Sequence, residues 1–129
     1  PESPKIPESI NTNGSAGVVN WTDDYDNGIF KASRDLMPIA IDFYTDWCGW
    51  CKKLDAEVYT DTSVIKSLKN FVCIKVDGDK RKDLVSKYSV SGYASVVFLN
   101  SQGTEFQRMG GFLPAESFLT KVNEALSKK

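Results

Sequence analysis

The sequence predicts an α/β fold with a central mixed β-sheet and helices on both of its faces. Two nearly continuous apolar segments, residues 39–45 and 71–77, have the composition of strands that are covered on both sides. Segments with helical spacing precede, separate and follow these strands, and residues 95–109 contain a hairpin pattern. Alternation of this kind places helices on each face of one sheet, and the hairpin adds an antiparallel part.

From Val18 onward the elements are expected in the order β-α-β-α-β-α-β-β-α, without an internal repeat. Pro38 ends the first helix, residues 61–63 cap the third, and Gly103 lies near the turn of the hairpin. The expected elements are a helix near 23–35, a strand at 39–45, helices at about 49–59 and 64–70, a strand at 71–77, a helix at 81–88, strands at 95–100 and 104–109, and a final helix that starts at Pro114.

Residues 1–17 differ in composition from the rest of the chain. They are rich in Pro, Ser, Asn and Gly and lack hydrophobic periodicity, so we expect a flexible leader or tether before one domain at residues 18–129. The chain begins with Pro rather than Met, which predicts a processed form or a fragment. The leader favours an extracytoplasmic location, periplasmic or secreted, although the cysteine content is equally compatible with the cytosol.

The overall composition excludes several classes of function. The net charge of −1 gives no electrostatic reason to expect nucleic acid as a partner. No apolar segment approaches the roughly twenty residues that cross a bilayer, so no membrane span is expected in this chain. The absence of histidine excludes Cys-His and Ser-His-Asp catalysis and imidazole-containing metal sites, and three cysteines are too few for a four-cysteine zinc site.

Two of the three cysteines, Cys48 and Cys51, lie three positions apart between a predicted buried strand and a predicted helix. Unpaired N–H groups and the peptide dipoles at a helix start favour a thiolate, and a thiolate is the attacking species in disulfide exchange. A permanent crosslink over so short a loop would remove little chain entropy, and a metal site would need two more ligands. The pattern therefore favours redox chemistry over these two alternatives.

The sequence W-C-G-W-C-K after I-A-I-D-F-Y-T-D resembles the thioredoxin superfamily, above all the thioredoxin-like domains of exported disulfide-handling proteins. The resemblance covers about residues 21–127. It implies the thioredoxin fold, with Cys48 as the exposed nucleophile and Cys51 as the resolving cysteine. It also implies that no organic cofactor is needed, and that the partners are protein substrates with disulfides or thiols and an upstream redox partner protein.

Asp42 lies six residues before Cys48 inside an apolar strand. A buried carboxylate is costly, so its pKa is expected to rise; by the resemblance, Asp42 accepts the proton of Cys51. The alternative is an ordinary Asp on a solvated face of the strand. Cys73 is expected in the core. Related proteins often carry a lysine at the position of Cys73, so the neutral thiol is expected to leave Asp42 less stabilised as an anion.

Two tryptophans frame Cys48. Trp50 is expected to face solvent at the helix start and to contact substrate, and Trp47 is a second candidate for substrate binding, with simple packing as the alternative. Trp21 and the other aromatic side chains are expected in the core.

Residues 89–98 resemble the family stretch V-x-G-x-P-(T/S), with Ala94 in place of the proline that follows a cis peptide bond. The resemblance gives Gly92, Tyr93 and Ala94 as substrate-facing residues. A cis bond to a residue other than proline costs about 2.5–4 kcal/mol, so the Tyr93–Ala94 bond is expected to be trans, or cis only under strain, and the loop is expected to be shifted or mobile. In the family this loop pairs with substrate and shields the cysteines, so Ala94 is expected to weaken substrate registration, to slow the release of mixed disulfides or to admit metal.

These observations together predict a thiol–disulfide oxidoreductase that acts on protein disulfides through a C-G-W-C dithiol/disulfide couple, with reduction as the favoured direction. Two other functions stay open at this point. One is a metal- or partner-binding thioredoxin-like module with incidental redox activity, and the other is a scaffold or chaperone-like domain.

Overall fold

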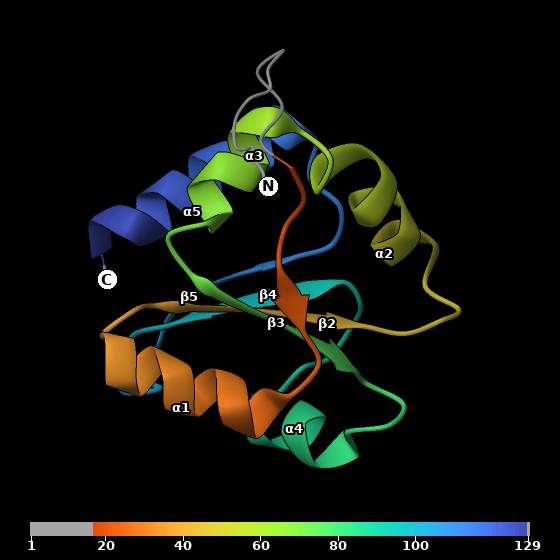
Figure 1. Cartoon of the computed structure of the whole chain (residues 1–129). Helices are drawn as coiled ribbons and strands as arrows, with labels where there is room; N and C mark the ends of the chain where they lie inside the picture. Colours follow the sequence, from red (N-terminus) through yellow and green to blue (C-terminus); the bar gives the residue numbers. More distant parts are fainter. Residues whose placement is uncertain (1–16, 129) are drawn as a thin grey trace.

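The computed structural model describes residues 17–128 and arranges them as a five-stranded mixed sheet with helices on both faces (Figure 1). The α/β architecture predicted from the sequence is confirmed. The expected leader, residues 1–17, lies outside the described residues except for Gly17.

The observed elements follow the predicted order. They are β1 (Trp21–Thr22), α1 (Tyr25–Asp35), β2 (Ile39–Tyr44), α2 (Gly49–Lys53), η1 (Leu54–Val58), α3 (Thr62–Leu68), β3 (Val72–Asp77), α4 (Lys82–Lys87), β4 (Ser95–Leu99), β5 (Glu105–Gly110) and α5 (Ala115–Lys128). The strand order in the sheet is β1-β3-β2-β4-β5. The strands β1, β3 and β2 are parallel, and β4 and β5 continue the sheet in the antiparallel sense.

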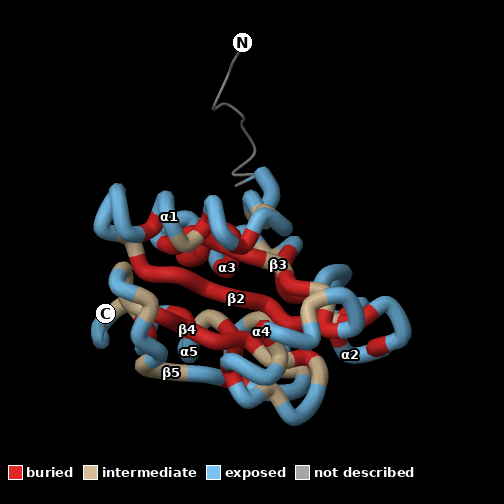
Figure 2. The backbone as a smooth tube through the Cα atoms, turned by 90° about the horizontal axis from the view of Figure 1, so that it is seen from below, coloured by how far each residue is buried: buried red, intermediate tan, exposed pale blue. Residues whose placement is uncertain are grey.

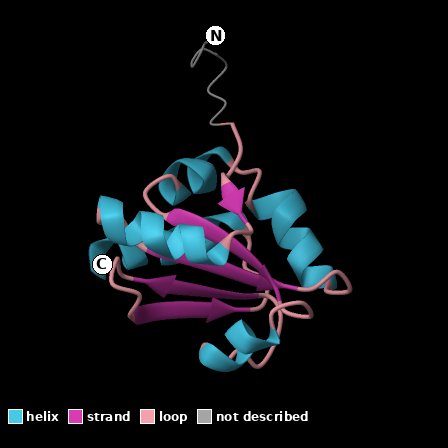
Figure 3. Ribbon diagram, turned by 60° about the horizontal axis from the view of Figure 1, so that its bottom comes forward, coloured by secondary structure: helices cyan, strands magenta, loops and turns pink. Residues whose placement is uncertain are grey.

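Two helical layers cover the sheet. Figure 3 shows helices on both sides of the sheet. The side chains of α1 and α4 pack in the core on one face, and those of α2, η1, α3 and α5 pack in the core on the other. The central strand β2 is buried along almost its whole length (Figure 2). Ile39, Ile41 and Phe43 belong to the core under α1, and Ala40 belongs to the core under α2 and α5. Since strand side chains alternate, Asp42 points to the same face as Ala40.

The cross-strand register places two charged residues side by side. Asp42 of β2 is the partner of Lys75 in the parallel strand β3. Ala40 is likewise the partner of Cys73. All four side chains therefore lie on the face of the sheet that α2 covers.

The helix expected at residues 49–59 begins and ends as predicted but changes type inside. It is an α-helix from Gly49 to Lys53 and a π-helix from Leu54 to Val58, and the N–H of Tyr59 bonds to the carbonyl of Leu54 at 2.9 Å. Short π-helical turns occur often next to functional sites. Here the wider turn buries Leu54 and Val58 while the segment also carries the exposed Asp55.

One prediction about the aromatic residues is wrong. Phe30 lies on the outer side of α1 with 61% of its surface exposed, and the guanidinium of Arg34 lies 5.8 Å from its ring centroid. The buried side of that helix is made by smaller residues such as Gly28 and Ala32, so the ring has no place in the core. Trp21, by contrast, packs edge-on against Tyr59, with ring centroids 4.9 Å apart.

Candidate active site

Cys48 lies where β2 gives way to α2, and it caps that helix. Its backbone is extended, with φ −83° and ψ 108°, and its N–H bonds to the carbonyl of Thr45 at 3.3 Å. The N–H of Cys51 donates to Sγ of Cys48 at 3.1 Å. The two cysteines form a disulfide, with their Cα atoms 5.3 Å apart. The predicted position of the pair at a helix start is confirmed.

The two sulfur-bearing residues are less accessible than the resemblance implies. Cys48 is 4% exposed and Cys51 is 3% exposed, so the expectation of an exposed Cys48 is wrong for this disulfide-bonded form. Both belong to the hydrophobic core cluster that also contains Ala94. The exposed surface here comes instead from the neighbouring Trp47 and Trp50, which are 68% and 55% exposed. The prediction that Trp50 faces solvent is confirmed.

Asp42 is buried on the α2 side of the sheet. Only 1% of the residue is exposed, which contradicts the alternative of a solvated strand face. Burial raises the pKa of Asp42, and the nearby Lys75 opposes this shift. Oδ2 lies 3.3 Å from Nζ of Lys75, and interaction with the Tyr59 hydroxyl also acts to lower the pKa. The raised pKa predicted from the sequence is confirmed.

Asp42 has a nearby cation that the sequence analysis did not anticipate, although its pKa is still raised, in line with an anion that is less stabilised. Cys73 is neutral, but Lys75 is two residues further along β3 and so lies on the same face of the sheet. Its ammonium group bridges Asp42 and the exposed Asp55 of η1. Burial favours the neutral form of Lys75, but Asp42 and Asp55 outweigh burial and raise its pKa. The cation therefore remains charged beside Asp42.

Three aromatic rings hold the ammonium group of Lys75. Its Nζ lies 5.5 Å, 5.0 Å and 5.4 Å from the ring centroids of Trp21, Tyr44 and Tyr59. Such contacts contribute about 0.5–2 kcal/mol each, and more when the cation is partly desolvated. Burial, followed by the charge of Asp42, raises the pKa of the Tyr59 hydroxyl well above its ordinary value. That hydroxyl is buried, and its interaction with the Asp42 carboxylate contributes to this rise.

Cys73 occupies the core, as predicted. Its Sγ contacts the carbonyl of Leu68 at 3.4 Å, and burial raises the pKa of the thiol to about 12. A thiol that stays protonated at physiological pH is a poor nucleophile. This residue is therefore distinct in reactivity from the disulfide pair.

The Tyr93–Ala94 peptide bond is cis, which contradicts the expectation of a trans bond. Two hydrogen bonds lie in and next to this loop. The carbonyl of the buried Ala94 accepts a hydrogen bond from the N–H of Gly111 at 2.8 Å, and the hydroxyl of Ser95 donates to the carbonyl of Gly92 at 2.6 Å. These bonds join the loop to the end of β5 and close the turn between Gly92 and Ser95.

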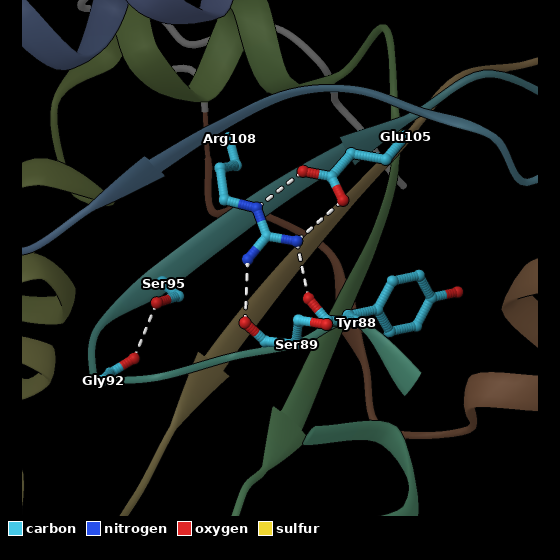
Figure 4. A network of polar contacts seen from close by, with 6 residues as sticks. All are labelled: Tyr88, Ser89, Gly92, Ser95, Glu105 and Arg108. Atoms are coloured by element: carbon cyan, nitrogen blue, oxygen red, sulfur yellow. Dashed lines mark hydrogen bonds and ion pairs between the residues drawn. The ribbon is translucent and has the colours of Figure 1, made fainter. Parts of the chain in front are cut away.

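Arg108 of β5 anchors the start of the same loop (Figure 4). Its guanidinium pairs with Glu105 in a two-pronged contact of 2.6 Å and 2.7 Å. It also donates to the carbonyl of Tyr88 at 2.6 Å and to the carbonyl of Ser89 at 3.4 Å. The backbone of Ser89 has a positive φ of 53°, a conformation that most residues adopt at a cost. These contacts offset that cost.

We expect Arg108→Met to lower the free energy of unfolding by about 1 kcal/mol, because two carbonyls and Glu105 lose a charged donor at a partly exposed site. Amide hydrogen exchange in residues 88–95 is expected to accelerate, while exchange in α5 stays the same. Thermal unfolding and exchange mass spectrometry measure the two effects. Glu105→Gln is the control that keeps the donor. Equal exchange in Arg108→Met and wild-type protein would contradict the anchoring role.

The other residues predicted to contact substrate include Trp47 and Trp50, and each of these belongs to an aromatic pair beside the cysteines. Trp47 meets Tyr93 edge-on, with centroids 5.9 Å apart, and Trp50 stacks on Phe112 at 5.8 Å. Tyr93 also covers Gly78, where any side chain would collide with its ring. Gly92 lies in the same loop as Tyr93 and is exposed.

Sequence reasoning missed Lys75, Arg108, Phe112 and Gly78. Lys75 alone left a usable signal, because it lies two residues from Cys73 in a predicted strand and so on the same face. The other three act through contacts between distant segments, which the pattern along the chain does not encode.

The described part of the chain contains neither a cluster of residues that could hold a metal ion nor a helix that could span a membrane. In residues 17–128, no three His, Cys, Asp or Glu side chains are grouped as a metal ion would require. None of the helices in that part of the chain has the length and apolar content needed to span a bilayer.

Comparisons with known proteins agree with this geometry. Residues 18–124 match the family model described as thioredoxin. A protein disulfide isomerase-like 2-2 of Oryza sativa subsp. japonica is 31% identical over 130 residues, which cover 92% of this chain and 34% of that protein. A thiol:disulfide interchange protein DsbD of Ralstonia nicotianae is 30% identical over 113 residues, with 84% of this chain and 19% of that protein covered.

The chain thus spans only about a third or less of these relatives. Among solved structures, a thioredoxin from Thermus thermophilus superposes with a TM-score of 0.78 at 24% identity, over 87% of this chain and 90% of that one. The C-terminal domain of Neisseria meningitidis DsbD superposes with a TM-score of 0.70 at 20% identity, over 82% and 99%. These likenesses confirm the fold, and the family match over residues 18–124 shows that the chain belongs to the thioredoxin family of disulfide oxidoreductases.

Proposed function

We propose that this chain is a thiol–disulfide oxidoreductase that reduces protein disulfides through the Cys48/Cys51 couple. The observation that carries the proposal is the disulfide between a helix-capping Cys48 and Cys51, whose N–H is directed at the capping sulfur. In the reduced protein the same N–H donor and the helix start favour a thiolate at Cys48.

The first step is attack by the Cys48 thiolate on a substrate disulfide. A bond forms between Sγ of Cys48 and one substrate sulfur, and the other substrate sulfur leaves as a thiolate. The product is a mixed disulfide between Cys48 and the substrate. Trp47, Trp50 and the loop of Gly92, Tyr93 and Ala94 lie around the cysteine pair and contact the substrate in this state.

The second step is attack by Cys51 on Sγ of Cys48. The thiol of Cys51 must first lose its proton, and Asp42 is the proposed base because it is buried, has a raised pKa and lies under α2 on the same face of the sheet. The attack releases the second substrate thiolate and leaves Cys48 and Cys51 oxidised. Two electrons have then passed to the substrate, and a dithiol on an upstream redox partner protein restores the couple.

We place this reaction outside the cytoplasm, in a periplasm or a secreted setting. Support comes from the composition of the leader and from relatives that are named as disulfide isomerases and interchange proteins. Protein substrates with disulfides or thiols are the proposed partners, and the reaction as written needs no organic cofactor.

The test is reduction of insulin disulfides with dithiothreitol as the electron source. We expect catalysis by the wild-type protein and none by Cys48→Ser. We expect Cys51→Ser to accumulate a covalent complex with insulin, because the resolving thiol is missing. Cys73→Ala is the matched control: its buried thiol has a pKa raised to about 12, so its loss should leave the rate within about twofold.

Equal rates for the wild-type protein and Cys48→Ser would refute the proposed activity. The direction of electron flow is tested by the midpoint potential of the Cys48/Cys51 couple, measured in glutathione buffers. A reductase requires a potential near that of cytosolic thioredoxins, about −270 mV, whereas a potential near about −120 mV would indicate an oxidase.

A further inference from the structure

The exposed aromatic residues beside the cysteine pair form two groups of opposite charge. The first, here called the acidic end, consists of Trp47, Tyr93 and Asp79. The indole N–H of Trp47 donates to Oδ2 of Asp79 at 2.9 Å, and the Tyr93 ring meets the Trp47 ring edge-on. The carboxylate is exposed and sits at the rim of this pair.

The second group, here called the basic end, consists of Trp50, Phe112 and Lys53. The Trp50 and Phe112 rings are stacked at an interplanar angle of 30°. The ammonium group of Lys53 lies 5.6 Å from the Trp50 centroid and 4.6 Å from the Phe112 centroid. One cation therefore covers both rings, and its side chain is exposed to solvent.

Further acidic groups strengthen the contrast between the ends. Asp46 is exposed immediately before Trp47 in the sequence. Besides burial, the charges of Asp79 and Asp77 raise the pKa of the Tyr93 hydroxyl. At the basic end, the exposed Lys52 precedes Lys53 in α2.

Large exposed tryptophans next to a reactive group favour contact with a partner. The two indoles flank Cys48, one residue before it and two residues after it, and more than half of each is exposed. Aromatic anchors with charged rims are typical of protein interfaces, and rim charges set the association rate and the choice of partner.

We propose that the two ends form one docking surface for a cysteine-containing protein segment that carries an acidic residue on the Lys53 side of its cysteine and a basic residue on the Asp79 side. This inference rests on the proposed function, because docking leads to the mixed disulfide at Cys48. The charges fix the direction in which the segment lies across the surface. The opposite direction would bring like charges together at both ends.

The test uses three peptides, Lys-Gly-Cys-Gly-Glu, Glu-Gly-Cys-Gly-Lys and Gln-Gly-Cys-Gly-Gln, each joined through its cysteine to thionitrobenzoate. The Cys48 thiolate of the reduced protein attacks the peptide sulfur and releases coloured thionitrobenzoate, so the second-order rate is read directly. One charged peptide is expected to react about threefold to tenfold faster than its reverse at low ionic strength. High salt is expected to remove the difference.

Variants of the two ends identify the source of the preference. Lys53→Met keeps the aliphatic stem without the charge, and Asp79→Asn keeps an acceptor for the Trp47 N–H. Each should lower the discrimination, and the double variant should abolish it. The charge-exchanged variant, Lys53→Glu with Asp79→Lys, should prefer the other peptide. Lys66→Met removes an exposed charge on α3, outside both ends, and should keep the wild-type preference.

The outcomes separate the two proposals. If the neutral peptide releases no thionitrobenzoate with wild-type protein, the proposed function fails. If all three peptides react at equal rates, the proposed function stands and the docking inference is overturned. A preference that persists unchanged in the double variant also overturns the inference, because other charges would then be responsible.

Discussion

Asp42→Asn is expected to slow the release of substrate from the mixed disulfide by about a hundredfold, the lower end of what a positioned general base contributes. Asparagine has nearly the same size as aspartate but cannot take up the proton of Cys51. Formation of the mixed disulfide should be much less affected, since Cys48 is the proposed nucleophile of that step. Single-turnover measurements with a chromogenic disulfide separate the two steps. A loss confined to the first step would contradict the proposed role.

The same variant is expected to be more stable than the wild-type protein at neutral and alkaline pH. Burial raises the pKa of Asp42, so the folded protein holds this proton to a higher pH than the unfolded chain, whose Asp titrates near about 3.9. Between the two pKa values the folded state binds more protons, so stability falls as pH rises through this window. The Asp42→Asn variant does not lose stability in this way, because asparagine does not titrate. Lys75 still has Asp55 as an ion-pair partner in the variant.

Urea unfolding at several pH values measures this effect. The difference between Asp42→Asn and the wild-type protein should grow as pH rises above the unfolded pKa and reach a plateau above the folded one. Asp83→Asn is a suitable control, because Asp83 is exposed and its pKa is lowered by its pairing with Arg81. Parallel stability curves for Asp42→Asn and wild-type protein would contradict a raised pKa of Asp42.

Lys75→Met is expected to have the second large effect, a loss of about 3 kcal/mol of unfolding free energy at alkaline pH. Removal of one partner from a buried ion pair leaves the other charge uncompensated, which costs about 3–5 kcal/mol. Here Nζ lies 3.3 Å from Oδ2 of Asp42, and the carboxylate is buried. The lower end of the range applies, because Lys75 is partly exposed.

The loss should shrink at low pH, where Asp42 takes up a proton and needs no cation. The pH dependence of the resolving step should move to higher pH, since Lys75 opposes the rise in the pKa of Asp42. A double-mutant cycle with Asp42→Asn checks the cause, because Lys75→Met should cost far less in that background. An unchanged cost would assign the effect to the aromatic contacts of Lys75 instead. Asp55→Asn, at the exposed end of the bridge, should cost less than about 1 kcal/mol.

The sequence predicts those features of the fold that depend on residues close together along the chain. The apolar segments at residues 39–45 and 71–77 give the two central strands, and Cys48 and Cys51 give the site because their spacing matches one helical turn. The π-helix from Leu54 to Val58 escaped prediction because its sequence has the same periodicity as an ordinary helix.

Other features of the site depend on which distant segments meet. The partnership of Asp42 and Lys75 is a matter of strand register, and a shift of one residue would have turned Lys75 to the other face. The form of the loop at Ala94 depends on Arg108 and Gly111, which belong to β5 and the segment after it. A single sequence predicts which residues are reactive, but these supporting contacts require the arrangement in space.

The position of β5 has a consequence for self-association. In the described part of the chain β5 is an edge strand of the sheet. The outer backbone edge of such a strand is a template on which a strand of another molecule can pair. The ion pair of Glu105 and Arg108 lies on this strand, and a recruited strand would have to strip water from both charges. The strand therefore carries its own protection against edge-to-edge aggregation, built from the same arginine that anchors the loop beside the disulfide.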